Sequence, residues 1–404
     1  MPASPSTARA INDRLALRLL QREGPLTAGQ LKQLTGLSRP TVADLVERLG
    51  ASGLITVVGE SGEQRRGPNA RLYGIVADRA HLAALDVRTE GVFVLVSDLV
   101  GRVLAEASVP IGGNTGTGPA VEQAVTAVER TVKEAGGRRL HTVGIGAPGL
   151  VDPATGDLRD SGGLPAWHRR LAAALQERLP EARVTVENET NLAALAEQRE
   201  GAARDRDTFV LLWLGHGVGA AVVLDGALRR GASGGTGEIG FLPVPGTVTL
   251  PSATDCDGGF HSLAGAAAIA RLAGEHGLPG AEPVDGPGVA VVVRAAVARV
   301  TEPPGGTAET GPAERFLDAL ADRIAIGAAS VVSILDPGCV VLGGEIGQAG
   351  GTVLAERVAE RLRRMSPLVT EVRAGRLGGT AVLRGALLTA RDRAQDELFA
   401  PADR

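Results

Sequence analysis

A short polar run near the start of the chain carries side chains that could bind DNA. Ser38, Arg39, Pro40 and Thr41 stand directly before apolar residues that recur at helical spacing. Hydroxyl and guanidinium groups at the exposed N-terminal end of a helix donate to base edges and phosphates when that helix enters a major groove. The sequence therefore predicts a recognition helix that begins after Ser38, a residue type that favours the helix N-cap.

A second group of candidate DNA contacts lies in a polar, glycine-containing loop. Arg65, Arg66 and Asn69 stand between two apolar strands, and the loop tip resembles the wing of winged-helix repressors. Residues 1–80 hold 11 basic against 7 acidic side chains, a local charge of +4 in a chain whose net charge is −4. A local excess of positive charge favours contacts with phosphates. We expect the two arginines to reach a minor groove or the DNA backbone.

Three helices and a β-hairpin would hold these side chains. The spacing of apolar residues predicts helices over 11–23, 28–34 and 39–49 and strands over 54–58 and 70–76. Thr27 is the predicted N-cap of the second helix and a further candidate DNA contact. These elements predict a winged helix-turn-helix domain over residues 1–78. The alternative is a three-helix bundle whose charges are only solvated.

The rest of the chain alternates apolar strands with helical segments, which is typical of an α/β fold. One order of elements, three strands, a helix and a strand, occurs twice. The first copy is expected at residues 83–87, 91–98, 102–108, 119–136 and 142–146. The second copy is expected at residues 209–214, 219–224, 227–230, 314–334 and 339–342. The repeat predicts two similar lobes, over residues 79–200 and 201–404, with a cleft between them.

The composition limits the class of protein. The chain has 404 residues, of which 44% are hydrophobic and 2% aromatic, and this favours two or three domains with cores of Ala, Val and Leu. Its two cysteines, Cys256 and Cys339, are too few for a disulfide framework or a cysteine-rich zinc site. No apolar run reaches the roughly 20 residues that a membrane-spanning helix needs. We therefore expect a soluble cytoplasmic protein without a membrane partner, in which Cys339 is buried in a strand.

Five features in order resemble the successive signatures of the ROK family, named for repressors, open reading frames and sugar kinases. They are Leu85-Asp86 with its strand meander, GIGAPGLVDPATG, VENETNLAALAE, GHGVGAAVVLDGALRRGASGGTGEIGF and LDPGCVVLGGEIG. The resemblance covers residues 10 to about 395 and includes the winged helix that the repressor branch carries. It implies a body similar to the actin and hexokinase ATPase fold, with a sugar in the cleft and nucleotide phosphates against glycine-rich turns.

The resemblance also implies which residues would hold ATP, and some of these differ from the family pattern. The first phosphate motif of the family, DxGGT, reads here as Asp86-Val87-Arg88-Thr89-Glu90. Side chains and a negative charge thus stand where backbone N–H groups should approach the triphosphate. The residues that remain of the phosphate turns are Asp86, Gly215, Gly217, Gly343 and Gly344. We therefore expect no bound ATP and no other cofactor.

The resemblance places four candidate ligand contacts in the cleft, Asn188, Glu189, Glu238 and His261. Glu189 stands where the family has its catalytic aspartate, and its extra methylene would displace the carboxylate by more than about 1 Å, an error that can cost about a hundredfold in rate. We assign no catalytic residue and do not expect kinase activity. Phe241 replaces the zinc-binding histidine of the family and Cys256 is the one cysteine nearby, so we expect no metal.

Three functions stay open at this point. The first is a sugar-responsive transcription repressor whose kinase-like body acts as an effector sensor, and the winged helix and altered phosphate motif favour it. The second is an active ATP-dependent sugar kinase. The third is a DNA-binding regulator that responds to another metabolite or to a protein partner. For the first function we expect a homodimer or homotetramer that binds an inverted repeat in double-stranded DNA.

Overall fold

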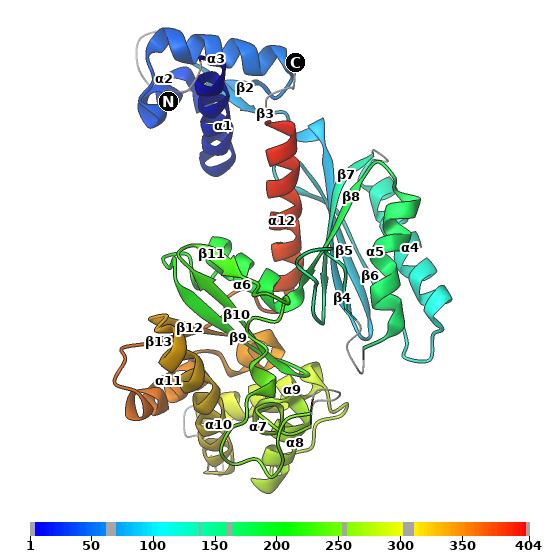
Figure 1. The fold of residues 1–404 in the computed structure, drawn as a ribbon, viewed down its shortest axis with the longest axis vertical. Helices are drawn as coiled ribbons and strands as arrows, with labels where there is room; N and C mark the ends of the chain where they lie inside the picture. The colour runs from blue at the N-terminus through cyan, green and yellow to red at the C-terminus, as the bar shows by residue number, and fades with distance from the viewer. Residues whose placement is uncertain are drawn as a thin grey trace.

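The computed structural model of the chain describes residues 5–61, 70–136, 139–159, 164–252, 257–301 and 311–400. Figure 1 shows a small N-terminal domain followed by two larger lobes. The C-terminal helix α12 (Ala381–Leu398) extends from between the lobes to the N-terminal domain. Among the described residues, no helix combines the length and the apolar character that crossing a membrane requires.

The first helices and strands form the predicted winged helix-turn-helix domain. They are α1 (Pro5–Glu23), β1 (Leu26–Thr27), α2 (Ala28–Thr35), α3 (Arg39–Ala51), β2 (Ile55–Ser61) and β3 (Ala70–Ile75). The strands form an antiparallel sheet in the order β1-β3-β2. Gly36 ends α2 in the left-handed conformation, at φ 70°, and this turns the chain into α3. Leu17, Leu31 and Leu45, one from each helix, are buried together in the core.

The first lobe is built on a five-stranded sheet in the order β6-β5-β4-β7-β8. After the 3₁₀ helix η1 (Ala77–Arg79), its elements are β4 (His81–Arg88), β5 (Gly91–Asp98), β6 (Val103–Pro110), α4 (Thr117–Glu134), β7 (Leu140–Ala147), α5 (Ala166–Arg178) and β8 (Arg183–Asn188). Strands β4, β5 and β6 form the predicted antiparallel meander, and β7 and β8 continue the sheet parallel to β4. Strands β4 and β5 are buried on both faces along nearly their whole length, and most of their residues are apolar.

The second lobe repeats this topology in the order β11-β10-β9-β12-β13. Its strands are β9 (Phe209–Leu214), β10 (Val218–Leu224), β11 (Ala227–Arg229), β12 (Cys339–Gly343) and β13 (Glu371–Ala374). Its helices are η2 (Ile239–Phe241), α7 (His261–Ala264), α8 (Ala266–Glu275), α9 (Gly286–Thr301), α10 (Gly311–Leu335), α11 (Gly344–Met365) and η3 (Gly378–Thr380). Cys339 is buried in β12, as predicted, and desolvation raises the pKa of its thiol to about 11.

Two helices join the lobes. Helix α6 (Glu189–Glu200) follows β8 and packs on α12, where Gly385 lies directly against the backbone of Leu192. Helix α12 also packs on β4 and β7 of the first lobe. The sequence assigned residues 201–404 to the second lobe, but by packing α12 lies with the first sheet. The apolar pattern of a helix shows that one face is buried and does not show which sheet will cover it.

The far end of α12 contacts the winged-helix domain. Gln395 Nε2 donates to Gln21 Oε1 of α1 at 2.7 Å and to the carbonyl oxygen of Leu99 at 3.0 Å. Gln21 Nε2 in turn donates to the carbonyl oxygen of Val100 at 3.1 Å. The amides are largely buried, so these bonds satisfy groups that would be costly to leave unpaired. Helix α12 thereby connects the region between the lobes with the winged-helix domain (Figure 1).

Candidate functional site

The N-terminal end of α3 is presented to solvent. Ser38 is the N-cap, and its Oγ accepts a hydrogen bond from the backbone N of Thr41 at 3.3 Å. The side chains of Ser38, Arg39 and Pro40 are exposed and Thr41 is half-buried. The opposite face of the helix is anchored in the core by Leu45, which is 1% exposed. The first turn of α3 therefore projects from the domain while the rest of the helix is held in place.

An ion-pair bridge fixes the orientation of α3. Arg48, in the last turn of α3, donates from Nη2 to Asp13 Oδ1 of α1 at 2.6 Å and also pairs with Asp44. Asp44 is exposed and shares the Arg48 guanidinium with Asp13, so its negative charge is only partly compensated. The bridge leaves the first turn of α3 as the part of the helix that can enter a groove.

Thr27 has only one of the two roles predicted for it. Its Oγ1 accepts from the backbone N of Gln30 at 3.2 Å, and its own backbone N donates to Gln30 Oε1 at 2.9 Å, which is a reciprocal capping box. The residue is 9% exposed. We therefore do not retain Thr27 among the proposed DNA contacts, because it is buried and its hydroxyl also donates to Gln30 Oε1 at 3.0 Å. The wing residues Arg65, Arg66 and Asn69 lie outside the described residues.

Asn188 organises the start of α6 at the carboxyl end of β8. Its Oδ1 accepts from the backbone N of Thr190 at 2.9 Å and of Asn191 at 3.2 Å, so the side chain is the N-cap of α6. Its Nδ2 donates to the carbonyl oxygen of Gly149 at 3.1 Å and to Glu189 Oε2 at 2.8 Å. The amide thus serves the helix and also orients the Glu189 carboxylate.

The Glu189 carboxylate lies in an acidic environment. Burial, together with the negative charges of Glu238, Asp86 and Glu345, raises the pKa of Glu189 to about 8. A charge effect of this kind requires the carboxylates to be near one another. The Glu238 carboxylate therefore lies near enough to Glu189 to influence its charge, and Asn188 contacts Glu189 directly.

The stability of the chain should fall as the pH rises through the range in which Glu189 titrates. Below pH 4.5, the ordinary pKa of a glutamate, Glu189 is protonated in both the folded and the unfolded state. Between pH 4.5 and about 8, the folded state alone holds the proton. Rising pH therefore favours the unfolded state. We expect Glu189→Gln to reduce the fall of the melting temperature across this range. Glu177→Gln, at an exposed carboxylate of α5, is the control, and an equal slope in all three proteins would contradict the assignment.

Glu238 and His261 come from the second lobe. Burial raises the pKa of Glu238, whereas burial and the charge of His216 lower the pKa of His261. His261 Nδ1 accepts from the backbone N of Val218 at 3.2 Å, which leaves Nε2 to carry the proton of the neutral ring. The ring lies edge-on to Phe241 with centroids 5.2 Å apart. His261 is thus a fixed, neutral hydrogen-bond donor and is not a surface histidine.

Arg88 fills the space beside the first phosphate motif. Its Nε and Nη2 donate to Asp86 Oδ2 at 2.9 and 2.6 Å, and Nη2 also donates to the carbonyl oxygen of Gly379 at 2.9 Å. The guanidinium carbon lies 4.5 Å from the centre of the Phe93 ring. Asp86 is 2% exposed, and burial raises its pKa while Arg88 acts against that shift. The buried carboxylate is therefore paired within the protein.

Glu345 was not among the residues predicted from the sequence. A Cβ built on Gly215 would lie 2.8 Å from Glu345 Oε2, so this carboxylate rests against the second glycine turn. Burial raises the pKa of Glu345, and Arg88 acts against the shift. Gly344 precedes it in the left-handed conformation, at φ 76°. The signal was available in the sequence, because an acidic residue directly follows Gly343-Gly344 where phosphates would approach.

The described residues contain no group of three or more His, Cys, Asp or Glu placed to hold a metal ion, and Cys256 lies outside them. A winged helix-turn-helix joined to two lobes of repeated topology defines the class of protein. It is a winged-helix domain on a body of the actin and hexokinase type. The sequence model of the ROK family matches residues 83–393, and the chain belongs to this family. The MarR family model matches residues 11–67, which is the winged helix.

Curated relatives of the chain include repressors and a kinase. The xylose repressor of Caldicellulosiruptor bescii is 26% identical over 242 residues, which cover 58% of this chain and 59% of the relative. The transcriptional dual regulator NagC of Escherichia coli is 27% identical over 246 residues, 58% of each chain. The chain thus spans under three fifths of the length of these two regulators. The glucokinase of Thermotoga maritima is 29% identical over 65% of this chain and 86% of its own.

Solved structures agree with the fold. A crystal structure of a ROK family transcriptional regulator, a homologue of the E. coli MLC protein, covers 97% of this chain and 98% of its own with a TM-score of 0.74 at 19% identity. A ROK hexokinase from Thermus thermophilus has a TM-score of 0.61 at 30% identity and covers 78% of this chain and 99% of its own. The first comparison includes the N-terminal domain, and the second corresponds to the body alone.

Proposed function

We propose that the chain is a sequence-specific DNA-binding transcriptional regulator, acting as a repressor, whose two-lobed body senses a sugar or sugar derivative. The observation that carries this proposal is the exposed first turn of α3 on a winged helix that is joined through α12 to the cleft. A kinase has no use for such a helix. The names of the xylose repressor and of NagC support the same function.

Two contacts favour a sensor over an ATP-dependent kinase. Arg88 pairs with Asp86 and the Gly379 carbonyl where the family motif has glycine, so a side chain occupies the approach to the phosphate turn. Glu345 lies against Gly215 and adds a carboxylate to the second turn. The negative charge of Glu345 opposes a triphosphate, and the bulky side chain of Arg88 removes the close backbone approach that phosphoryl transfer needs. We infer that the cleft binds a ligand without phosphorylating it.

The proposed DNA contacts are Ser38, Arg39, Pro40 and Thr41 of α3 together with Arg65, Arg66 and Asn69 of the wing. Two copies of the chain in a homodimer or homotetramer would present two recognition helices to an inverted repeat. The half-sites would then lie about one helical turn of DNA apart, or a multiple of it.

Arg39→Ala should weaken binding to the preferred duplex by about 1–3 kcal/mol and relax the base preference at one position, if Arg39 reads a base. The preferred duplex would first be selected from a random library with the full chain. Binding of both proteins to the selected and to a random duplex would then be measured at fixed salt. Lys32→Ala, at an exposed basic residue of α2, is the matched control. A uniform loss on both duplexes would instead make Arg39 a phosphate contact.

The sensor half of the proposal is tested by thermal shift. A ligand that binds only the folded state raises the melting temperature. We expect a monosaccharide to raise it, ATP with Mg²⁺ to leave it unchanged, and Glu238→Gln to abolish the effect of the sugar. A shift with ATP together with phosphorylation of the sugar would establish a kinase. The absence of any shift with sugars would favour a regulator whose signal is another metabolite or a protein partner.

A further inference from the structure

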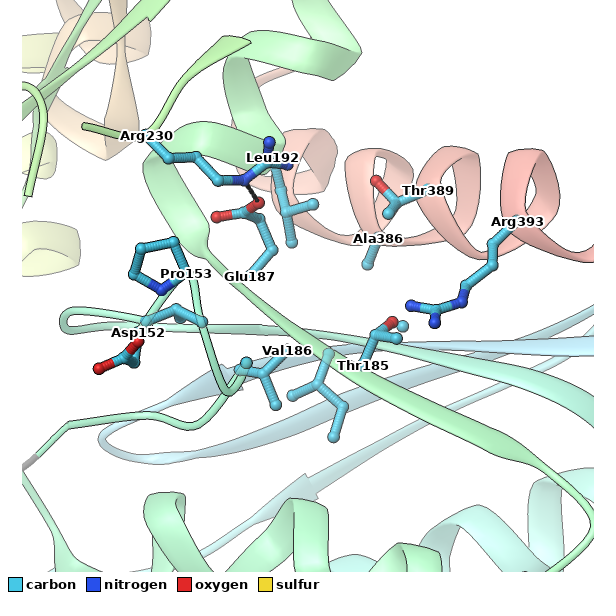
Figure 2. Close-up of a pocket in the computed structure, with 14 residues that line it drawn as sticks. Asp152, Pro153, Thr185, Val186, Glu187, Leu192, Arg230, Ala386, Thr389 and Arg393 are labelled. Carbon is cyan, nitrogen blue, oxygen red and sulfur yellow. Dashed lines mark hydrogen bonds and ion pairs between the residues drawn. The ribbon is translucent and has the colours of Figure 1, made fainter. Parts of the chain in front are cut away.

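A pocket of about 200 Å³ lies behind the first sheet, between β7, β8 and α12. Figure 2 shows its lining, which also includes Leu192 of α6, Pro153 from the loop after β7 and Arg230 from the second lobe. None of the four candidate ligand contacts in the cleft lines this pocket. The pocket therefore offers a binding place whose lining differs from the candidate ligand contacts.

The polar lining of the pocket is arranged around its two ends. Arg230 and Arg393 approach from opposite ends, and Thr185 and Thr389 lie on its walls (Figure 2). Each threonine donates its own proton to the backbone, Thr185 Oγ1 to Val143 O at 3.3 Å and Thr389 Oγ1 to Gly385 O at 2.9 Å. The two oxygens therefore keep lone pairs that accept hydrogen bonds from a ligand hydroxyl.

The charges at the two ends differ. At one end Arg230 Nε pairs with Glu187 Oε2 at 2.7 Å, so the two charges compensate each other. At the other end Arg393 and Arg183 share one carboxylate, that of Glu397, at 3.5 and 2.9 Å. Two guanidinium groups against one carboxylate leave an excess of positive charge, and the longer of the two contacts is that of Arg393. The pocket has room for an anion beside Arg393.

We propose that this pocket binds a small organic anion, a polyol that carries a carboxylate or a phosphate. Arg393 holds the anionic group, because a guanidinium donates two parallel hydrogen bonds to a carboxylate or phosphate. The hydroxyl groups of the ligand donate to Thr389 and Thr185. Its carbon chain lies against the apolar wall that Leu192 and Ala386 provide.

The position of the ligand would give it a direct influence on α12. Arg393 is two residues before Gln395, whose side chain bonds Gln21 of the winged-helix domain at 2.7 Å. Glu187 connects the pocket with the candidate ligand contacts, because its Oε1 accepts from the backbone N of Asn188 at 3.0 Å. A ligand here would thus lie within one helical turn of the contact between α12 and the DNA-binding domain.

Calorimetric titration of the full chain with gluconate, glucose 6-phosphate and inorganic phosphate tests the proposal. We expect gluconate or glucose 6-phosphate to bind with a Kd below about 1 mM. The ligand that binds more tightly shows whether the pocket prefers a carboxylate or a phosphate. Arg393→Gln should weaken that binding at least about tenfold, since it removes a charge-assisted contact. Arg294→Gln, at an exposed arginine of α9, should leave it unchanged.

Further variants separate this pocket from the cleft. Glu238→Gln should leave the binding of the anion unchanged. If this variant lost anion binding, the anion would bind in the cleft and the proposal would be overturned. Thr389→Val keeps the side-chain volume. It should weaken the binding of the hydroxylated anion and leave the binding of inorganic phosphate unchanged. The melting temperature of each variant without ligand checks that it folds. Equal affinity of wild type and Arg393→Gln, or no binding of either polyol anion, would also overturn the proposal.

Discussion

Replacement of Arg88 by methionine should lower the free energy of unfolding by about 3–5 kcal/mol near pH 8, the usual cost of breaking a buried ion pair by removing one partner. Asp86 is 2% exposed and would lose both hydrogen bonds from Arg88. Methionine retains the volume and the contact with Phe93, so the loss reports the missing charge. Denaturant unfolding monitored by circular dichroism measures the difference.

The same substitution should cost less near pH 5. Burial already raises the pKa of Asp86, and removing Arg88 takes away the charge that opposes this shift. The carboxyl group of the variant therefore protonates at a higher pH when the protein is folded, and the destabilisation grows as the pH rises through that value. A loss of stability that stays constant from about pH 5 to about pH 8 would contradict a buried unpaired carboxylate as its cause.

Arg102→Met is the matched control for Arg88. Asp98 is as buried as Asp86, at 3% exposed, but its partner Arg102 is 77% exposed and lies 3.4 Å away. Asp98 Oδ1 also accepts from the backbone N of Val100 at 3.1 Å and of Arg102 at 2.9 Å, bonds that the substitution preserves. An exposed arginine contributes about 0–1 kcal/mol to such a pair. Equal losses of stability in the two variants would show that the Arg88–Asp86 pair contributes no more than the pair made by the exposed Arg102.

Gly385→Ala should lower the free energy of unfolding by about 3 kcal/mol, at the upper end of what overpacking a core costs. A Cβ at this position would lie 2.1 Å from the backbone oxygen of Leu192 and 2.5 Å from its carbonyl carbon. Backbone atoms in a packed helix cannot turn aside as a side chain can, so α6 and α12 must separate. Denaturant unfolding measures the loss.

Gly274→Ala is the control, because it makes the same change in a helix with open space. Nothing lies within 4 Å of a Cβ at Gly274, which is exposed on α8. Alanine there should stabilise the chain by about 0.5–1 kcal/mol through its higher helix propensity. If Gly385→Ala were as well tolerated as Gly274→Ala, the contact between α6 and α12 would not be a close one.

The Gly385 substitution also bears on the proposed function. Helix α12 carries Gln395 to the winged-helix domain at one end, and its other end follows Gly379, whose carbonyl accepts from Arg88 in the cleft. A change in the spacing of α6 and α12 would therefore reach both sites. We expect Gly385→Ala to alter how a sugar affects DNA binding in addition to lowering stability, since a shared element must have two arrangements for two sites to be coupled.

Local patterns were enough to predict the winged helix and the internal repeat. Ser38 and Thr27 were recognised as helix caps because a cap depends on hydrogen bonds within a few residues. The meander of β4, β5 and β6 was predicted because continuous apolar strands separated by short polar turns have few other arrangements. The second role given to Thr27 is not supported because tertiary packing buries this cap, which is 9% exposed, whereas the cap Ser38 stays exposed.

The sequence by itself determined the elements, the family pattern and the candidate polar residues of the cleft, because each depends on neighbours along the chain or on a string of residues. Tertiary structure decided which sheet α12 covers, which distant carbonyl Arg88 contacts and where Glu345 rests. The partners in these contacts, Gly144 with Ala386, Arg88 with Gly379 and Gly215 with Glu345, are separated by more than a hundred residues of sequence. Contacts between such distant residues follow from how the sheets and helices pack, and no local periodicity encodes them.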